Sequence, residues 1–543
     1  MNTVNLLVVV TAFLLYTAAI VAIGLYSARY GRHSDEDFFL ADRSLGRWVA
    51  ALSASASSES GWVTLGLVGI GFAGGVQGYW VIPGCLLGYL FNWFVIAGRM
   101  NDQARQLGAV TLPDFLAYRF NERVPLIRTV AVLVILVAMM AYVAAQMAAA
   151  GKTFSVLFEA AQPTPASVLP ADVAPTPVAE PAQAPKDPAT TGVSWQYSLG
   201  VVLGAVIVLL YTVTGGFRAV CWTDALQALL MLGALVVFPV YLLARHGGYA
   251  FITQTLGDVA DPAAGLPAGY LLDPWAGLAG LALVGFLLGS HALGINFGYP
   301  GMPHVLVRFM ALKDRREARV AGVVAFCWGL CVYWGAVTVG LFVRAMYESG
   351  ADWAAILQID KEVGLVAAAI YLLPGVLSGL VVAAVLAAIC STADSQLVVA
   401  ASSAAHDLYG RVFKGHGRTG HMLVNRLVVL GLGIGAVLLV FETRVNVYQY
   451  VLTYGWAMLG AAFGPQVILA VLWRRASYAG CLAGMLVGFI LVLAWGRLYD
   501  SAATGVEIYN LPLAFCGALL VNVLVSLATS GRKNAAAAPV TTS

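Results

Sequence analysis

The stretch Ala51–Trp62, ALSASASSESGW, lies inside a run that is otherwise apolar enough to span a membrane. It holds five serines and one glutamate within twelve residues. Serine side chains compete for backbone hydrogen bonds and loosen a helix. Freed backbone carbonyls at membrane depth are tolerated only where they line a cavity or are buried in protein. The stretch therefore predicts the unwound centre of a discontinuous transmembrane helix, and we expect it to form part of an ion and solute site.

The composition of the whole chain agrees with a membrane protein. Its 543 residues are 60% hydrophobic and 10% charged, with a mean hydropathy of +0.83, whereas soluble chains carry about 25% charged residues. The seven cysteines lie in or beside apolar segments and form no CxxC pair, which is typical of small core residues. The sequence shows no metal-ligand cluster, nucleophile triad or phosphate loop, so we expect no enzyme.

Apolar runs of about 20 residues mark the membrane spans. The first run has no basic residue before it and is too long for a signal peptide, so we interpret it as a true span. About thirteen runs are expected, at 4–27, 47–73, 77–98, 125–157, 196–213, 219–244, 274–302, 318–346, 366–408, 422–441, 446–472, 477–498 and 511–529. The run at 366–408 is expected to include a short helix outside the membrane near Val363–Leu373.

The positions of the basic residues predict the orientation. With the N-terminus outside and the spans alternating, 23 of the 30 Lys and Arg residues fall in inside segments and 7 in outside ones. Cytoplasmic loops carry the excess of Lys and Arg. We therefore expect a protein of the cell membrane with its N-terminus outside and its C-terminus in the cytoplasm. A loop at 160–192, rich in Pro and Ala, is predicted outside, and residues 533–543 are predicted to form a disordered cytoplasmic tail.

A second helix is also interrupted. The sequence GFLLGSHALGINFGYPGMPH at 285–304 places glycines and prolines inside an apolar run. The two interrupted helices each open a group of five spans, at 47–244 and 274–472. Interrupted segments at matching positions of two halves indicate a transporter site. Because five is odd, the second group is inserted upside down. We therefore expect an all-α polytopic protein with a five-plus-five inverted repeat, one span before it (4–27) and two after it (477–529).

The ninth span carries a polar stripe. Ala388, Ser391, Thr392 and Ser395 follow the i, i+3, i+4, i+7 spacing of one helix face, and Asp394 lies at its edge. Hydroxyls and unwound carbonyls are hard oxygen donors, which suit a hard cation such as Na⁺. Hydroxyls also commonly bond back to their own helix, but an acid inside the membrane favours a function.

The sixth span carries a second intramembrane acid, Asp224, for which we also expect a functional role. Arg218 lies six residues before it and does not share its helix face. His304 and Arg308 follow the second break, and we expect them at the cytoplasmic exit, in contact with loops or helix ends.

Five motifs together resemble the sodium:solute symporter family, over about residues 35–473. They are DEDFFLADRSLGRWVAALSASASSESGW (35–62), TLPDFLAYRF (111–120), YTVTGGFRAVCWTD (211–224), MPHVLVRFMA (302–311) and AAICSTADSQL (387–397). The resemblance implies the inverted-repeat transporter fold and Na⁺ as the coupling ion.

The resemblance also implies site residues. It implies Na⁺ ligands at the carbonyls of Ala56, Glu59 and Ala388 and the hydroxyls of Ser391 and Thr392. A second Na⁺ in some members implies a site at Asp224, Ser391, Asp394 and Ser395. The solute residues implied are Ser60, Gly61, Trp62, Tyr142, Gln146, Ile295, Tyr299 and Pro303. The chain departs from proline carriers at Ser58, where they are acidic, and at Ile295, where they have tryptophan; Glu59 is acidic here instead.

The function predicted from these features is Na⁺-coupled symport of a small solute, proline or another amino acid or a small carboxylate, by alternating access. The partners expected are the solute and the lipid bilayer, with no nucleic acid, and the chain is expected to work as a monomer. Three alternatives stay open: an H⁺-coupled symporter in which Glu59, Asp224 or Asp394 titrates, a channel, and a solute-sensing membrane module.

Overall fold

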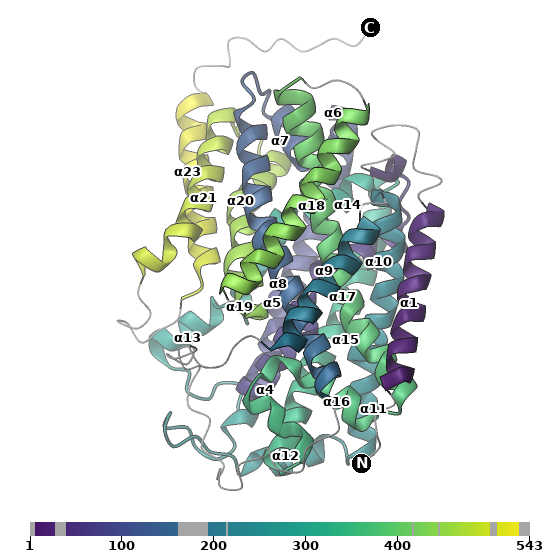
Figure 1. Ribbon diagram of the computed structural model, residues 1–543. Coiled ribbons are helices and arrows are strands. Elements are labelled where there is room, and N and C mark those ends of the chain that lie inside the picture. The colour runs from purple at the N-terminus through teal and green to yellow at the C-terminus, as the bar shows by residue number, and fades with distance from the viewer. Residues whose placement is uncertain are drawn as a thin grey trace.

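The computed structural model describes residues 6–27, 40–160, 194–212, 216–414, 418–443, 446–499 and 508–530. Over these residues it is a bundle of helices, most of which run along one long axis (Figure 1). Nine of the described helices are long and apolar enough to cross a membrane. The predicted all-α polytopic class is confirmed, whereas the count of about thirteen spans is not. The predicted loop from residue 161 to 192 and the tail at 533–543 lie outside the described residues.

The helices have the following bounds. The first half of the chain contains α1 (Leu6–Ser27), η1 (Ala41–Arg43), α3 (Arg47–Ser58), η2 (Trp62–Leu67), α4 (Val68–Gly74), η3 (Gly75–Trp80), α5 (Val81–Leu90), η4 (Phe91–Ala97), α6 (Gly98–Leu107), α7 (Leu112–Arg119), α8 (Leu126–Ala160), α9 (Trp195–Thr212), α10 (Phe217–Leu232), η5 (Gly233–Val237), α11 (Phe238–Arg245), α12 (Tyr249–Gly257) and η6 (Tyr270–Leu272). The second half contains α13 (Gly280–Leu287), η7 (Leu293–Gly301), α14 (Pro303–Ala311), α15 (Arg315–Glu348), η8 (Asp352–Gln358), η9 (Lys361–Val363), α16 (Gly364–Leu372), α17 (Gly375–Ser402), η10 (Ser403–Val412), α18 (Arg418–Thr443), α19 (Val447–Tyr450), η11 (Val451–Trp456), α20 (Ala457–Leu472), α21 (Tyr478–Leu498) and α23 (Asn510–Ser530).

The serine-rich stretch is broken where its sequence predicts. Helix α3 ends at Ser58, and Glu59 leaves helical geometry with φ −100° and ψ 79°. The chain passes through Ser60 and Gly61 and resumes as the π-helix η2, which continues into α4. A π-helical turn is often found at functional sites. The break leaves the last carbonyls of α3 without partners in their own helix.

The second break also lies in the predicted segment. Helix α13 ends at Leu287, and the chain continues as a 3₁₀-helix, η7. Met302 is extended, with φ −84° and ψ 103°, and Pro303 then begins α14. A β-carbon on Gly298 of η7 would overlap the indole of Trp456, so this close approach requires glycine. The two broken helices are confirmed; the division of the chain into two inverted repeats stays a prediction.

The long apolar run at 366–408 is two helices rather than one. Helix α16 ends at Leu372 and α17 begins at Gly375. Pro374 between them restricts the preceding residue to extended backbone, and Leu373 has φ −108° and ψ 153°. Helix α16 is therefore the short separate helix that the sequence analysis expects near Val363–Leu373.

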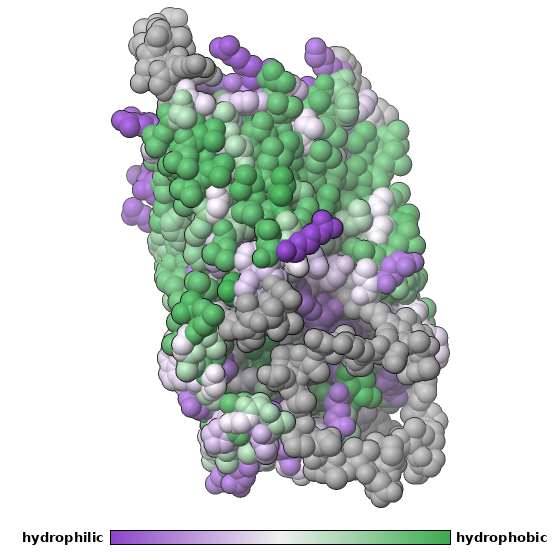
Figure 2. All heavy atoms as spheres, turned by 90° about the vertical axis from the view of Figure 1, so that its left-hand side faces the viewer, coloured by the Kyte–Doolittle hydropathy of each residue, from purple (hydrophilic) through white to green (hydrophobic). Residues whose placement is uncertain are grey.

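The outer surface of the bundle is apolar. Helices α18, α21 and α23 expose leucines such as Leu438, Leu520 and Leu524. Figure 2 shows a broad apolar face over the upper part of the view, with hydrophilic residues at its upper rim, at mid-height and below. Helices α6 and α7, which belong to predicted inside segments, lie at one end of the bundle, and α12 and α16 lie toward the other (Figure 1). An apolar band of this kind suits a hydrocarbon surrounding.

Candidate ion and solute site

Helix α17 meets the broken end of α3 through hydroxyl groups. The hydroxyl of Ser391 donates to the carbonyl of Ala56 at 3.0 Å and to that of Ala388 at 3.0 Å. The hydroxyl of Thr392 donates to the same Ala56 carbonyl at 3.4 Å. All these residues are fully buried. The structure thus gathers four of the five oxygens expected to bind Na⁺; Glu59, which would supply the fifth by its carbonyl, directly follows the last residue of α3.

This oxygen set is suited to a small hard cation. It consists of neutral carbonyl and hydroxyl oxygens, which are the donors that hard cations prefer. Ser391 and Thr392 bond to a carbonyl of another helix, and not only back to α17. Their rotatable hydroxyls can direct lone pairs toward a cation held between the two helices. The residues present therefore fit Na⁺.

The second expected cation site contains an arginine. Asp224 of α10 and Ser395 of α17 lie together as expected, but the guanidinium of Arg308 from α14 lies between them. Its Nη2 is 2.7 Å from Asp224 Oδ2 and 2.7 Å from Ser395 Oγ. Its Nε donates to Ser53 Oγ at 2.7 Å. The hydroxyl of Ser57 donates to Asp224 Oδ2 at 3.0 Å.

The expected contact of Arg308 with loops or helix ends is therefore wrong, whereas its place at the cytoplasmic exit stays a prediction. Its side chain is fully buried, because Asp224 needs a counter-charge inside the protein. His304, one turn earlier, is fully buried as well. Ser391 is hydrogen-bonded to α3 rather than to Asp224. Asp394, one residue before Ser395, is rotated from it by about 100° around the axis of α17, so the two side chains leave the helix in different directions.

The expected solute residues next to the first break are joined by one glutamine. The amide N–H of Gly61 donates to Gln146 Oε1 at 3.1 Å, and Gln146 Nε2 donates to Ser60 Oγ at 3.2 Å. All three are buried, and Gln146 comes from α8. The ring of Trp62 packs against Tyr333, with centroids 6.2 Å apart.

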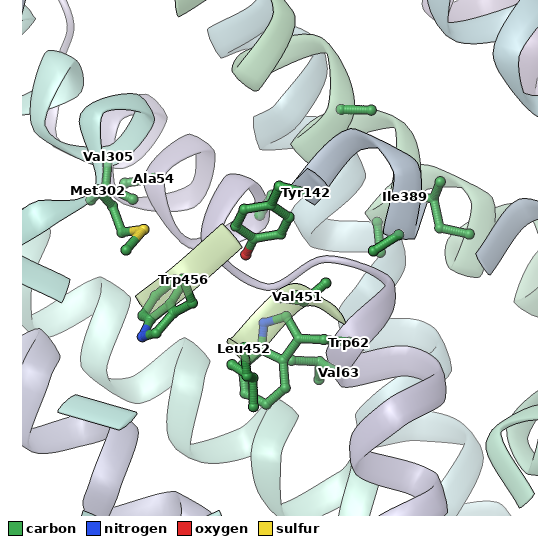
Figure 3. Packing of buried hydrophobic residues seen from close by; sticks show 14 of the residues in the cluster. Ala54, Trp62, Val63, Tyr142, Met302, Val305, Ile389, Val451, Leu452 and Trp456 are labelled. Carbon is green, nitrogen blue, oxygen red and sulfur yellow. The ribbon is translucent and has the colours of Figure 1, made fainter. Parts of the chain in front are cut away.

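The expected solute residues of the second break pack on η11. Trp456 donates its indole N–H to the carbonyl of Ile295 at 3.0 Å, and its ring meets Tyr299 edge-on at 4.8 Å. Tyr142 of α8 packs against His304, which directly follows Pro303. Figure 3 shows Trp62, Tyr142 and Trp456 in one buried cluster, with the Tyr142 hydroxyl directed away from Ile389.

The two groups of expected solute residues meet at the side chain of Glu59. Its Oε1 accepts a hydrogen bond from the hydroxyl of Tyr299 at 3.4 Å and from that of Tyr333 at 2.5 Å. Trp62 lies three residues after Glu59 and packs on the same Tyr333. The structure therefore places residues of both breaks around one closed, fully buried centre.

The model of the sodium:solute symporter family matches residues 38–162 and 190–488. The chain belongs to this family. The high-affinity proline transporter PutP of Bacillus subtilis is 32% identical over 501 residues, which cover 92% of this chain and 94% of that protein. The sodium/proline symporter of Escherichia coli is 31% identical over 485 residues, covering 89% of this chain and 86% of that one.

A solved structure shares the fold of this symporter. It is the substrate-bound outward-open state of a Na⁺-coupled sialic acid symporter, with a TM-score of 0.68 at 17% identity. The match covers 96% of this chain and 97% of the other. The membership of the family makes this chain a membrane symporter that couples sodium to a small solute, not an enzyme.

Sequence reasoning missed three contributors to the centre of the symporter. Tyr89 and Tyr333 lie in apolar spans that carry no break or acidic signal, and Trp456 lies in a third. Only the tertiary fold brings them together. A signal was present for Arg308: a buried acid needs a cation, and this arginine sits inside the apolar run MPHVLVRFMA.

A further charged cluster lies at the end of the bundle near α7. Arg128 pairs with Asp114 at 2.6 Å, Asp407 at 2.9 Å and Glu122 at 3.1 Å. Asp114, His406 and Asp407 are close enough together to hold a metal, although the sequence shows no such cluster. The guanidinium of Arg128 already supplies a cation to both carboxylates, so the geometry indicates an ion-pair network that joins α7, α8 and η10.

The pKa of Asp114 reports this network. Burial raises it, but the nearby His406 and the charge of Arg128 more than offset burial and hold the pKa of Asp114 below its usual range. A folded-state pKa below the unfolded value stabilises the protein above the unfolded pKa. That stabilisation is lost as the pH falls through the folded-state pKa.

Replacing Arg128 with alanine is expected to destabilise the symporter by about 3–5 kcal/mol, because three carboxyl groups would lose their shared cation. Thermal unfolding in detergent measures this as a lower midpoint. Arg123→Ala is the matched control, since Arg123 is exposed, and should leave the midpoint unchanged. Equal midpoints for the two variants would show that the network does not stabilise the fold.

Proposed function

We propose that Na⁺ binds between α3 and α17, at the carbonyls of Ala56, Glu59 and Ala388 and the hydroxyls of Ser391 and Thr392. The observation that carries this proposal is the convergence of the two hydroxyls on Ala56 at the helix break. An ion held there links the broken helix to α17. Binding therefore favours the conformation in which the two helices are together, and it orders Ser60 to Trp62 for the solute.

One Na⁺ is transported per cycle in this proposal. The cation site at Asp224 and Ser395 is filled by the guanidinium of Arg308, which is tethered to the protein and fully buried. A second Na⁺ next to that guanidinium would meet charge repulsion in a low-dielectric interior. The residues of this second site therefore do not fit a metal ion while Arg308 is in place.

The solute proposed is a small zwitterion or carboxylate, with proline first because relatives of this chain are proline transporters. It would lie among Ser60, Gly61, Trp62, Tyr142, Gln146, Ile295, Tyr299 and Pro303, all of which are buried. The backbone carbonyl of Ile295 accepts the indole N–H of Trp456. Gln146 supplies polar contacts to Ser60 and Gly61.

Transport follows alternating access around this fixed site. In the proposed orientation the N-terminus is outside and the C-terminus is in the cytoplasm, so Na⁺ enters down its gradient. Moving one charge across 100 mV supplies about 2.3 kcal/mol, to which the Na⁺ concentration gradient adds. The cell membrane is the proposed location, and one chain is the proposed functional unit.

Replacing external Na⁺ with choline at fixed pH should abolish uphill solute uptake in proteoliposomes, because choline is a large organic cation that cannot take the place of Na⁺ among these oxygens. Radiolabelled L-proline, followed by a panel of amino acids and small carboxylates, measures uptake. Undiminished uptake in choline that follows a pH gradient would favour H⁺ coupling instead. Flux without saturation or accumulation would indicate a channel.

A further inference from the structure

The carboxyl group of Glu59 is surrounded by hydroxyl groups. Its Oε1 accepts from Tyr333 at 2.5 Å, Tyr89 at 3.0 Å, Ser58 at 3.0 Å and Tyr299 at 3.4 Å. The other oxygen, Oε2, is buried and has no hydrogen-bond partner. We call Tyr89, Tyr299 and Tyr333 the tyrosine cage. The cage fixes one carboxyl oxygen and leaves the second one available.

Glu59 also lacks a counter-charge within the part of the chain that the structure describes, since none of the ion pairs found there includes it. Arg308, the arginine of the neighbouring buried pair, is bound to Asp224. A fully buried carboxylate is costly unless a cation pairs with it. An ion-pair partner for the Glu59 carboxylate would therefore have to be a bound ligand rather than one of the described residues.

The surroundings of Glu59 are aromatic, which suits an organic cation. Tyr89 packs on Tyr299 at 5.2 Å and on Tyr333 at 6.5 Å, and Trp62 packs on Tyr333 at 6.2 Å. Rings of this kind attract ammonium groups through their faces, and aromatic cages are a common way to bind them. A desolvated carboxylate among such rings offers both interactions to one amine.

We propose that Glu59 and the tyrosine cage bind the positively charged amine of the transported solute. This proposal rests on the proposed function and deepens it, because it selects amine-bearing solutes over simple carboxylates. It separates two roles of one residue: the backbone carbonyl of Glu59 is a proposed Na⁺ ligand, and its side chain is proposed to recognise the solute. The cage residue Tyr299 and the neighbouring Trp62 already belong to the proposed solute site.

The position of Glu59 supports this division of roles. Its Oε1 is reached from three separate elements, α5, η7 and α15, which contribute Tyr89, Tyr299 and Tyr333. A solute amine paired with Glu59 would therefore join the first broken helix to the second.

The test compares ligands that differ only in the amine. Purified symporter in Na⁺ is titrated with three pairs of ligands: L-proline and cyclopentanecarboxylate, L-alanine and propionate, and L-valine and isovalerate. The second member of each pair lacks the amine. The readout is thermal stabilisation of the protein. The proposal expects stabilisation by an amine-bearing member and by none of the amine-free ones. Equal stabilisation by an amine-free carboxylate would overturn it.

Glu59→Gln supplies the second arm of the test. It keeps the size of the side chain and should raise the Kd of the amine-bearing ligand at least about tenfold, while an unchanged elution profile in size-exclusion chromatography shows that the variant is folded. Tyr333→Phe keeps the carboxylate and should give a smaller rise. An unchanged Kd in folded Glu59→Gln would overturn the amine assignment. Absence of ²²Na⁺ binding in the wild type would instead count against the proposed function.

Discussion

Replacing Arg308 with glutamine is expected to abolish transport and to destabilise the protein by about 3–5 kcal/mol, because the buried carboxylate of Asp224 would lose its only ion-pair partner among the described residues. Arg308 also holds the hydroxyls of Ser53 and Ser395 through direct hydrogen bonds. The variant therefore disturbs α3, α10 and α17 together. Thermal unfolding in detergent and uptake in proteoliposomes measure the two effects.

Two controls separate charge from packing. Arg316→Gln changes an exposed arginine at the start of α15 and should alter neither stability nor uptake. The double variant Asp224→Asn with Arg308→Gln removes both charges and should recover much of the lost stability, since replacing a whole buried pair costs less than breaking it. A double variant as unstable as Arg308→Gln alone would contradict the account of this pair.

Replacing both Ser391 and Thr392 with alanine is expected to raise the Na⁺ concentration needed for half-maximal uptake by about 10–100-fold, on the scale at which groups supporting a metal site change affinity. Two of the five proposed ligand oxygens would be lost, whereas the helix backbone of α17 would be kept. Uptake measured over a range of Na⁺ concentrations, corrected for the amount of protein in the membrane, gives this value.

Ser402→Ala is the control for that variant. Ser402 is buried on the same helix and donates only to the carbonyl of Val399, 2.9 Å away on its own turn. Its replacement should leave the Na⁺ requirement unchanged. A Na⁺ requirement in the Ser391 and Thr392 variant equal to that of the control would remove both residues from the ion site.

The sequence predicts those parts of the site that depend on residues close together in the chain. Polar residues in an apolar span mark the break at Glu59, and the i, i+3, i+4, i+7 spacing predicts that Ser391 and Thr392 share a face. Both features depend on backbone chemistry within a few residues. The structure places that face against the Ala56 carbonyl, although contact between the two segments was beyond any local pattern.

The parts that the sequence does not predict are long-range. The positive-inside rule counts charges near the ends of spans, so it groups Arg308 with the basic residues of an inside loop. In the structure Arg308 belongs to helix α14, which follows the second break. The tyrosine cage draws one residue from each of three elements. The sequence shows that Glu59 departs from the pattern of the proline carriers. It does not show which residues contact Glu59, because these are tyrosines in ordinary apolar spans.

The most direct measurement is the binding of ²²Na⁺ to the purified protein in the absence of solute. We expect saturable binding of one ion per chain, which the Ser391 and Thr392 double alanine variant loses and Ser402→Ala retains. Undiminished binding in the double variant would contradict the site between α3 and α17. Binding of two ions per chain by the wild type would contradict the role of Arg308 as the second cation.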